Sequence, residues 1–301
     1  MHKPDISLTA IIAKLRQLTG ETIVLIPISE GEDSRAFRYD HAAGSFVVRV
    51  NRSIDGFAKD AFVWKHFSSA ALPIPAVVDY GMLEDGNAYC ISQMAKGFTL
   101  QELSPQQLPP VLEPVADIMA AIARSDIGST HGYGPFDAGG NGRDATWQAF
   151  LSAVSAYDWS RVAGFPGAGR IDDLVRHCMT LIPSCPNIRA LVHADFGSNN
   201  VLTDGRRITG VIDWSEAIYG DPLYEVANIL FWRPWLECME QQARYFEAFR
   251  PDLVRNQNVL ACYQLRIGMQ QIHESAIDGA LADAGWALER CRVIESTLRQ
   301  G

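Results

Sequence analysis

The sequence predicts an α+β protein of two lobes, a small sheet-rich lobe followed by a larger helical one. Three observations lead to this prediction. Strand-like segments crowd the first ninety-odd residues, helical periodicity dominates after them, and Lys96-Gly97 marks the change between the two. We place the boundary after residue 95, so that residues 1–95 form the first lobe and residues 96–301 the second.

The first lobe is expected to be a small sheet with one helix. The opening segment, MHKPDISLTAIIAKLRQL, has apolar residues at helical spacing and an early Asp5, so we interpret it as an amphipathic helix and not as a signal peptide. Strands are expected over residues 21–29, 36–40, 45–51, 72–83 and 88–95, and a further helix over residues 55–70.

The second lobe is expected to be mostly helical around one hairpin. Helices are predicted over residues 108–125, 146–154 and 171–182 and from Asp221 to the end, whereas the Gly-rich residues 129–142 are interpreted as a surface excursion. Asp221 is a candidate helix cap and a candidate anchor for the loop before it, and Pro222 would be the first helical residue. Strands over 201–203 and 208–213 would form a hairpin through the Asp204-Gly205 turn.

Composition narrows the functional classes. The 301 residues are 48% hydrophobic and 20% charged, and no apolar run reaches transmembrane length. A formal charge of −9 disfavours a partner with a phosphate backbone and suits a cationic one. None of the six cysteines shows a C-x-x-C or zinc-ligand spacing, so we expect reduced thiols. We therefore expect a cytoplasmic monomer with no nucleic-acid or membrane partner.

The stretch LVHADFGSNNVL contains two signatures of phosphoryl transfer that share one aspartate. His193, Asp195 and Asn200 form H-x-D-x-x-x-x-N, which in kinases supplies the catalytic base, and Asp195 also opens a D-F-G tripeptide, which supplies a metal ligand. One carboxylate cannot do both. Phosphoryl transfer needs a positioned nucleophile and metal ions on the phosphates, so a second carboxylate is required.

The second carboxylate is expected at Asp213. It ends the apolar strand of the hairpin, as a rigid metal ligand should, and residues 170–187 offer no base loop upstream that would support the opposite assignment. We therefore predict that Asp195 is the base, that Asn200 and Asp213 bind Mg²⁺ through oxygen, and that the D-F-G match is incidental. His193 is interpreted as a structural brace of the loop.

A phosphate clamp is expected from the first lobe. Arg49 lies on a predicted strand and Asp60 on the following helix, a pair that replaces the usual Lys and Glu, and Arg binds phosphate oxygens bidentately. The alternative is a surface Arg. The loop over residues 29–37 has one glycine, Gly31, and is no G-x-G-x-x-G, but Ser34 and backbone N–H groups could contact phosphate.

These residues, in this order, resemble the aminoglycoside phosphotransferase family, whose members have a protein-kinase-like fold. The matching stretches are SEGEDSRAF, HFSSAALPIP, LVHADFGSNNVLTD, VIDWSEA, YEVANI and FWRPWL, between residues 29 and 236. The base motif followed by I-D-W is specific for the superfamily. FWRPWL and HADFGSNN are narrower and resemble the hygromycin-modifying members.

The resemblance implies a kinase with an alcohol acceptor that uses ATP and Mg²⁺. It implies that the backbone of Gln93 and Ala95 binds adenine, and that the substrate is a cationic aminoglycoside antibiotic, hygromycin B, phosphorylated at the cyclitol 4-hydroxyl and so inactivated. The glycine-poor loop, Arg49 and Asp60 depart from the wider family pattern and leave the phosphate contacts open.

The antibiotic pocket is expected beside Asp195 in the helical lobe. Trp residues stack on sugars and Glu residues pair with amines, and residues 231–242 carry both kinds, at Trp232, Trp235, Glu237 and Glu240. The alternative is that both Trp residues belong to the core. Asn199 is a candidate hydrogen-bond partner of the substrate, and Glu216 is either substrate-facing or a surface charge.

Two other functions remain open at this point. One is a kinase of the same fold that acts on a different hydroxylated compound, such as an amino alcohol or a macrolide. The other is a non-catalytic nucleotide-binding protein. The complete set of Asp195, Asn200 and Asp213 disfavours the second of these.

Overall fold

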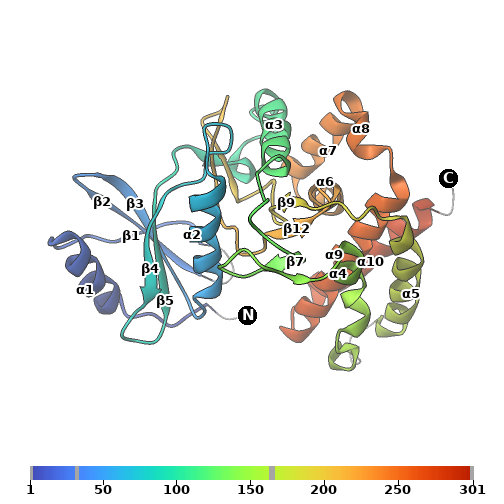
Figure 1. Ribbon diagram of the computed structural model, residues 1–301, viewed down its shortest axis with the longest axis horizontal. Helices are drawn as coiled ribbons and strands as arrows, with labels where there is room; N and C mark the ends of the chain where they lie inside the picture. Colours follow the sequence, from blue (N-terminus) through green and yellow to red (C-terminus); the bar gives the residue numbers. More distant parts are fainter. Residues whose placement is uncertain (1–2, 31–33, 163–166, 299–301) are drawn as a thin grey trace.

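The structure, a computed structural model, describes residues 3–30, 34–162 and 167–298. A sheet-rich part lies beside a larger helical part, as Figure 1 shows. The elements of the first part are α1 (Leu8–Thr19), β1 (Ile26–Pro27), β2 (Arg35–His41), β3 (Gly44–Asn51), α2 (Asp55–Phe67), β4 (Val77–Met82) and β5 (Ala88–Gln93).

The first sheet has the strand order β1-β2-β3-β5-β4, with every neighbouring pair antiparallel. Side chains alternate between the two faces of a strand, so Phe46, Val48 and Val50 of β3 enter one core together with α1. Arg49 points to the opposite face, which α2 covers, and its guanidinium lies 5.2 Å from the ring centroid of Phe57. The period-2 pattern of VVRV therefore turns the one charged residue toward α2.

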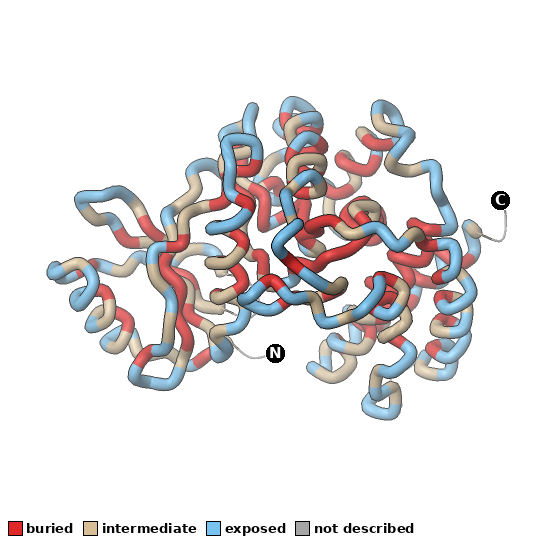
Figure 2. The backbone as a smooth tube through the Cα atoms, viewed as in Figure 1, coloured by how far each residue is buried: buried red, intermediate tan, exposed pale blue. Residues whose placement is uncertain are grey.

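The second part contains two small sheets surrounded by helices. Its strands are β6 (Phe98–Thr99), β7 (Tyr133–Phe136), β8 (Gly142–Asp144), β9 (Ala190–Val192), β10 (Val201–Thr203), β11 (Ile208–Val211) and β12 (Ile218–Gly220). Its α-helices are α3 (Leu112–Ala123), α4 (Trp147–Ser152), α5 (Ile171–Leu181), α6 (Leu223–Trp232), α7 (Glu237–Phe249), α8 (Pro251–Val254), α9 (Gln257–Ile277) and α10 (Leu281–Leu298). Figure 2 shows buried backbone in both sheet regions and in the helices around α6 and α9.

The link between the two parts is tied to the predicted catalytic hairpin. One small sheet has the order β11-β10-β6, so the strand that follows the link pairs directly with the hairpin. Gly97 has φ +108°, and a Cβ there would lie 2.1 Å from the carbonyl oxygen of Thr203. Only glycine fits this close approach. The α+β, kinase-like fold predicted from the sequence is confirmed.

Several element predictions need correction. The strand expected over residues 21–29 forms only at Ile26–Pro27, at the edge of the sheet. The N–H of Ile28 extends the pairing by one hydrogen bond, to the carbonyl oxygen of Ala36 at 3.2 Å. The Gly-rich stretch is not a surface excursion: β7 and β8 join the sheet β8-β7-β12-β9, and Phe136 stacks on Tyr219 with ring centroids 4.3 Å apart. Strand β12 was not predicted at all. Gly31 of the phosphate-loop prediction lies outside the described residues.

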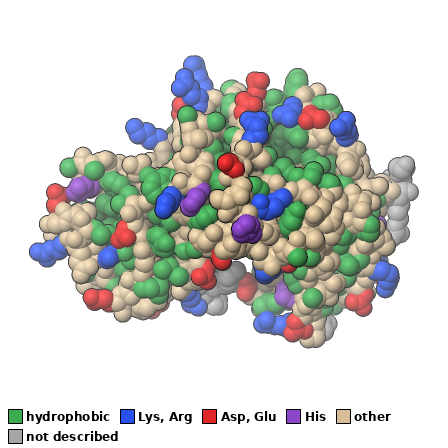
Figure 3. All heavy atoms as spheres, in the orientation of Figure 1, with side chains coloured by type: hydrophobic (Ala, Val, Ile, Leu, Met, Phe, Trp, Pro, Cys, Tyr) green, Lys and Arg blue, Asp and Glu red, His purple; other side chains and the backbone are tan. Residues whose placement is uncertain are grey.

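Other features of the chain bear on its environment. None of the described helices combines the length and apolar character that crossing a bilayer would need. All six cysteines are buried with free thiols. On the face drawn in Figure 3, positive and negative side chains intermingle over both parts, so charge of one sign is not gathered there.

Candidate active site

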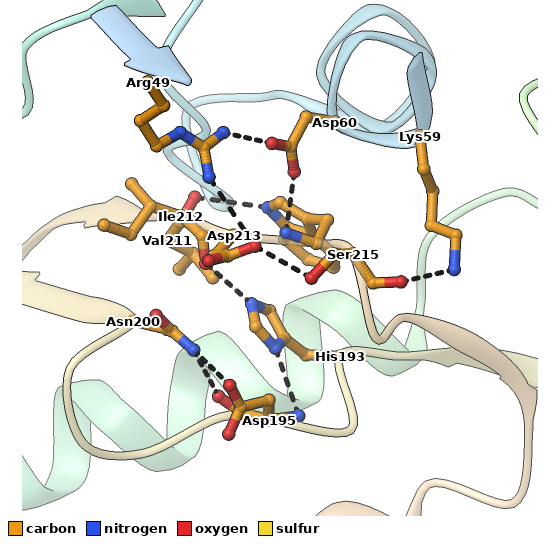
Figure 4. Close-up of polar contacts among 11 residues, drawn as sticks. Arg49, Lys59, Asp60, His193, Asp195, Asn200, Val211, Ile212, Asp213 and Ser215 are labelled. Carbon is orange, nitrogen blue, oxygen red and sulfur yellow. Dashed lines mark hydrogen bonds and ion pairs between the residues drawn. The ribbon is translucent and has the colours of Figure 1, made fainter. Parts of the chain in front are cut away.

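The predicted base lies in a loop that leaves the buried strand β9. Ala194 has φ +66° and Gly197 φ +105°, so the backbone turns sharply on both sides of Asp195. The side-chain amide of Asn200 donates to the backbone oxygen of Asp195 at 2.9 Å and to its Oδ2 at 2.7 Å (Figure 4). Because the side-chain NH₂ group of Asn200 donates its hydrogen bonds to Asp195, the amide oxygen of Asn200 is the atom that could bind a cation.

The loop is anchored by Glu225 of α6, a residue that sequence reasoning missed. The buried carboxylate accepts the backbone N–H groups of His193 at 2.8 Å, Ala194 at 3.1 Å and Phe196 at 3.3 Å. Burial raises the pKa of Glu225 to about 7, while these three hydrogen bonds act in the opposite direction. A carboxylate in the otherwise apolar helix LYEVANILFW was the available signal.

Asp221, the candidate loop anchor, has another role. The helix begins at Leu223, so Pro222 and not Asp221 is the N-cap of α6, and the positions predicted for both residues were wrong by one. Asp221 still binds the start of the helix, because its Oδ1 accepts the N–H of Leu223 at 3.0 Å. Its Oδ2 accepts the hydroxyl of Tyr263 on α9 at 2.9 Å. Asp221 thus joins two helices below the site, and the anchoring of the loop belongs to Glu225.

His193 is a neutral brace between the two motifs. Its Nδ1 accepts the N–H of Asp195 at 3.3 Å, so Nε2 carries the proton and donates to the carbonyl oxygen of Ile212 at 2.9 Å. The ring is fully buried, and burial lowers the pKa of His193 to about 4. The histidine therefore connects the Asp195 loop to the strand that leads to Asp213, as its predicted bracing role requires.

Asp213 follows β11 with φ +59°, an uncommon conformation for a non-glycine residue. Hairpin pairing brings it to the Asp195 loop, because the N–H of Ile212 donates to the backbone oxygen of Asn200 at 2.9 Å. Its Oδ1 accepts the hydroxyl of Ser215 at 2.9 Å and lies 3.6 Å from Arg49 Nη1. An amide oxygen on Asn200 and a carboxylate on Asp213 are hard donors of the kind that Mg²⁺ prefers.

The predicted pairing of Arg49 with Asp60 is confirmed. Arg49 Nη2 donates to Asp60 Oδ2, and the other oxygen of Asp60 accepts the N–H of Trp214 at 2.7 Å. Burial acts to lower the pKa of Arg49, but the carboxylates of Asp60 and Asp213 outweigh it and hold that pKa above its ordinary value. A permanently charged guanidinium therefore stands beside the candidate metal ligand (Figure 4).

A cleft of about 760 Å³ collects most of the predicted site residues. Those that line it are Ser34, Arg49, Asp195, Asn199, Asn200, Asp213 and Trp235. Gln93 and Ala95 lie at the link between the two parts. The N–H of Gln93 already donates to the carbonyl oxygen of Ala76 at 2.8 Å, and neither Gln93 nor Ala95 is among the residues that line the cleft. Glu237 instead lines a neighbouring hollow with Trp235 and Glu240.

A second cleft of about 970 Å³ lies on the other side of Asp195. The two clefts share Asp195 and Glu216, so the predicted base stands where they meet. The second cleft has a lining of mixed charge. Its carboxylates include Glu274, Asp278 and Asp283, from α9, α10 and the turn between them, and its cations are Lys3, Lys59, Arg143 and Arg266. Sequence reasoning missed this charged lining, because these residues belong to no local motif.

Comparison with known proteins decides the family. The model of the phosphotransferase enzyme family matches residues 24–257. The hygromycin-B 4-O-kinase of Escherichia coli is 48% identical over 297 residues, which is 98% of this chain and 87% of that protein. The chain belongs to the phosphotransferase enzyme family.

Solved structures of family members agree with this assignment. A thermostable mutant of aminoglycoside phosphotransferase APH(4)-Ia, in a ternary complex with AMP-PNP and hygromycin B, superposes with a TM-score of 0.90 at 49% identity, over 95% of this chain and 97% of that one. The GDP complex of aminoglycoside 2'-phosphotransferase-IIIa gives a TM-score of 0.66 at 16% identity, over 96% and 97% of the two chains. The second likeness shows the fold alone.

The tryptophans of this family member divide between core and cleft. Trp232 packs against the helical core and lines both clefts, whereas Trp235 is 49% exposed. Trp286 of α10, which the sequence did not single out, stacks on Trp232 at 5.2 Å and meets Trp235 edge-on at 4.7 Å. The sequence left two alternatives, that both Trp232 and Trp235 line the pocket or that both belong to the core, and neither alternative holds for both residues.

Proposed function

We propose that this chain transfers the γ-phosphoryl group of ATP to hygromycin B, at the 4-hydroxyl of its cyclitol. The observation that carries the proposal is the position of Asp195 where two clefts meet, one with Arg49, Asn200 and Asp213, the other a larger cleft with charged side chains of both signs. The similar Escherichia coli protein is a hygromycin-B 4-O-kinase, and the similar APH(4)-Ia structure holds an ATP analogue together with hygromycin B.

In this proposal Asp195 acts as the general base. The acceptor hydroxyl enters from the second cleft, its oxygen attacks the γ-phosphorus, and Asp195 takes its proton as ADP leaves on the far side. Asn200 supports the assignment, because its amide holds Oδ2 of Asp195 at 2.7 Å and so orients the carboxylate. Glu225 holds the backbone on both sides of the base.

Asn200 and Asp213 would hold Mg²⁺, which when bound would supply positive charge to offset that of the phosphates. Across residues 3–30, 34–162 and 167–298, no group of three or more His, Cys, Asp or Glu side chains is arranged to hold a metal. Such a sparse protein ligand set suits Mg²⁺, which keeps waters and nucleotide phosphates as its other ligands.

Residues 1–95 would form the nucleotide-binding lobe and residues 96–301 the lobe that holds the base, the metal ligands and the acceptor. Adenine would bind the backbone carbonyl of Gln93 and the N–H of Ala95, and the phosphates would reach Arg49 and Ser34. Arg49 supports this role, since Asp60 fixes its guanidinium at the cleft that Asp213 also lines.

The acceptor would be recognised by charge and by stacking. Glu216, Glu274 and Asp283 would pair with ammonium groups of the antibiotic in a cleft that cations also line, and a net charge of −9 favours its approach. Trp235 offers an exposed ring for a sugar face. Asn199 and Glu237 would add polar contacts at the cleft and in the neighbouring hollow.

The test is turnover by the purified chain. With Mg-ATP we expect hygromycin B to stimulate ADP release, and the product to gain one phosphate group that NMR places on the cyclitol 4-hydroxyl. Amino alcohols, macrolides and other aminoglycosides serve as competing acceptors. Stimulation by one of these and not by hygromycin B would reassign the substrate, and nucleotide binding without any turnover would show a non-catalytic protein.

A further inference from the structure

Lys59 is a buried cation that has no part in the chemistry described so far. It lies on α2 next to Asp60 and is 8% exposed. Its ammonium donates to the carbonyl oxygen of Ser215 at 2.6 Å (Figure 4). It also donates to the carbonyl oxygen of Ala217 at 3.1 Å and lies 4.9 Å from the ring centroid of Phe136. A lysine is seldom buried unless its charge is met by such partners.

Those two carbonyl groups belong to the turn that follows Asp213. The N–H of Ala217 donates to the carbonyl oxygen of Trp214 at 2.9 Å and closes this turn just before β12. The lysine ammonium therefore holds both carbonyls from one side, while Asp60 accepts the N–H of Trp214. Consecutive residues of α2 thus grip the amide and the carbonyls of a single short segment, residues 214–217.

A third contact supports the same attachment. Gly56, one turn earlier on α2, approaches so closely that a Cβ there would lie 3.1 Å from Ser215 Cβ. In protein kinases the corresponding helix must move into place before the phosphate clamp is complete. Here α2 is fastened to the segment after Asp213 by Lys59, Asp60 and close packing.

We propose that Lys59 is a positioning residue that fastens α2 to residues 214–217, so that Asp213 is already in place before the metal and nucleotide bind. The inference rests on the proposed role of Asp213 as a metal ligand. Asp213 has a positive φ, and such an uncommon backbone conformation persists only where the surrounding structure holds it. The contacts of α2 with residues 214–217 supply that support.

The test substitutes Lys59→Met, with Lys65→Met as a matched control on the same helix, since Lys65 is exposed. In the full chain without metal or nucleotide, we expect faster amide hydrogen exchange across residues 213–217 in Lys59→Met only. With ATP and hygromycin B, the Mg²⁺ concentration for half-maximal turnover should rise roughly tenfold, which is about 1.4 kcal/mol.

A merely structural lysine would lower the melting temperature without moving the Mg²⁺ dependence. Unchanged exchange across 213–217, or an unchanged Mg²⁺ dependence, in a folded Lys59→Met protein would therefore overturn the proposal. If Lys59→Met does not fold, Lys59→Gln, which keeps N–H donors without the charge, carries the same two measurements. Failure of the proposed function would show differently, as absent turnover in the unmodified chain.

Discussion

Replacing Glu225 by Gln perturbs the catalytic loop at its anchor without removing volume. Oε2 accepts two N–H groups, from His193 and Ala194, while Oε1 accepts one, from Phe196. A glutamine keeps most hydrogen bonds by placing its oxygen at the Oε2 position. Its NH₂ group then faces the N–H of Phe196, which is left without an acceptor in a buried site.

The size of the effect follows from that geometry. An unsatisfied buried donor costs about 1–3 kcal/mol, so we expect Glu225→Gln to lower the free energy of unfolding by about 2 kcal/mol. Asp195 lies in the chain between Ala194, whose N–H keeps its acceptor, and Phe196, whose N–H loses it. A small displacement of a catalytic group can cost about 100-fold in rate, so kcat should fall by roughly 10–100-fold while the ATP KM stays within about twofold.

The assay combines urea unfolding with steady-state kinetics at about pH 8, where Glu225, with a pKa of about 7, is mostly ionised in the native protein. Glu289→Gln is the matched control, because that residue is exposed and forms an ion pair with Arg292 on its own helix. Exposed helix pairs contribute about 0.3–0.5 kcal/mol. If Glu225→Gln behaved like this control in both measurements, the anchoring role would be refuted.

Two further predictions concern the pocket and the buried histidine. Trp235→Ala should raise the hygromycin B KM by roughly tenfold, because an exposed ring is lost from the cleft, and leave the ATP KM nearly unchanged; equal effects on both would indicate a packing role. Burial lowers the pKa of His193 from 6.5 to about 4. The contribution of the neutral ring to the free energy of unfolding is therefore fully present above pH 6.5 and is lost, by up to about 3 kcal/mol, as the pH falls through 4. The raised pKa of Glu225 acts in the opposite sense, because its contribution to stability is lost as pH rises toward 7. Both the unmodified chain and His193→Gln contain Glu225, so the difference between their free energies of unfolding at each pH isolates the contribution of the histidine. A pH-independent difference would contradict the assignment.

The features that the sequence predicts best are those set by residues close together in the chain. The hairpin after the catalytic loop follows from two apolar strands and an Asp-Gly turn, and its first strand forms where it was expected. The second strand, predicted to end at Asp213, ends at Val211, and Asp213 lies beyond it with a positive φ. The pairing of Arg49 with Asp60 could be anticipated, because strand alternation and the next helix set their spacing. The prediction of a surface excursion for the Gly-rich stretch was wrong because its glycines hide the alternation of β7. The buried Phe136 of that strand packs on a strand more than eighty residues later in the chain.

What the sequence could not predict depends on which helix faces meet in space. Glu225 looks like one charge in an apolar helix until α6 is placed under the loop. Glu274 and Asp283 come from α9 and α10, whose charges follow ordinary surface patterns until the cleft brings them together. Lys59 resembles any helix lysine, since its partners are backbone carbonyls that carry no sequence signature.

The central claim is that Asp195 is the base and Asp213 the metal ligand. Its most direct test measures turnover and Mg-nucleotide affinity together in Asp195→Asn, with Asp213→Ala alongside. We expect Asp195→Asn to lose roughly 100- to 10,000-fold in kcat, the range of general base catalysis, while it binds Mg-nucleotide normally. Asp213→Ala should weaken that binding. Near-normal turnover in Asp195→Asn, or loss of metal-dependent binding there and not in Asp213→Ala, would contradict the assignment.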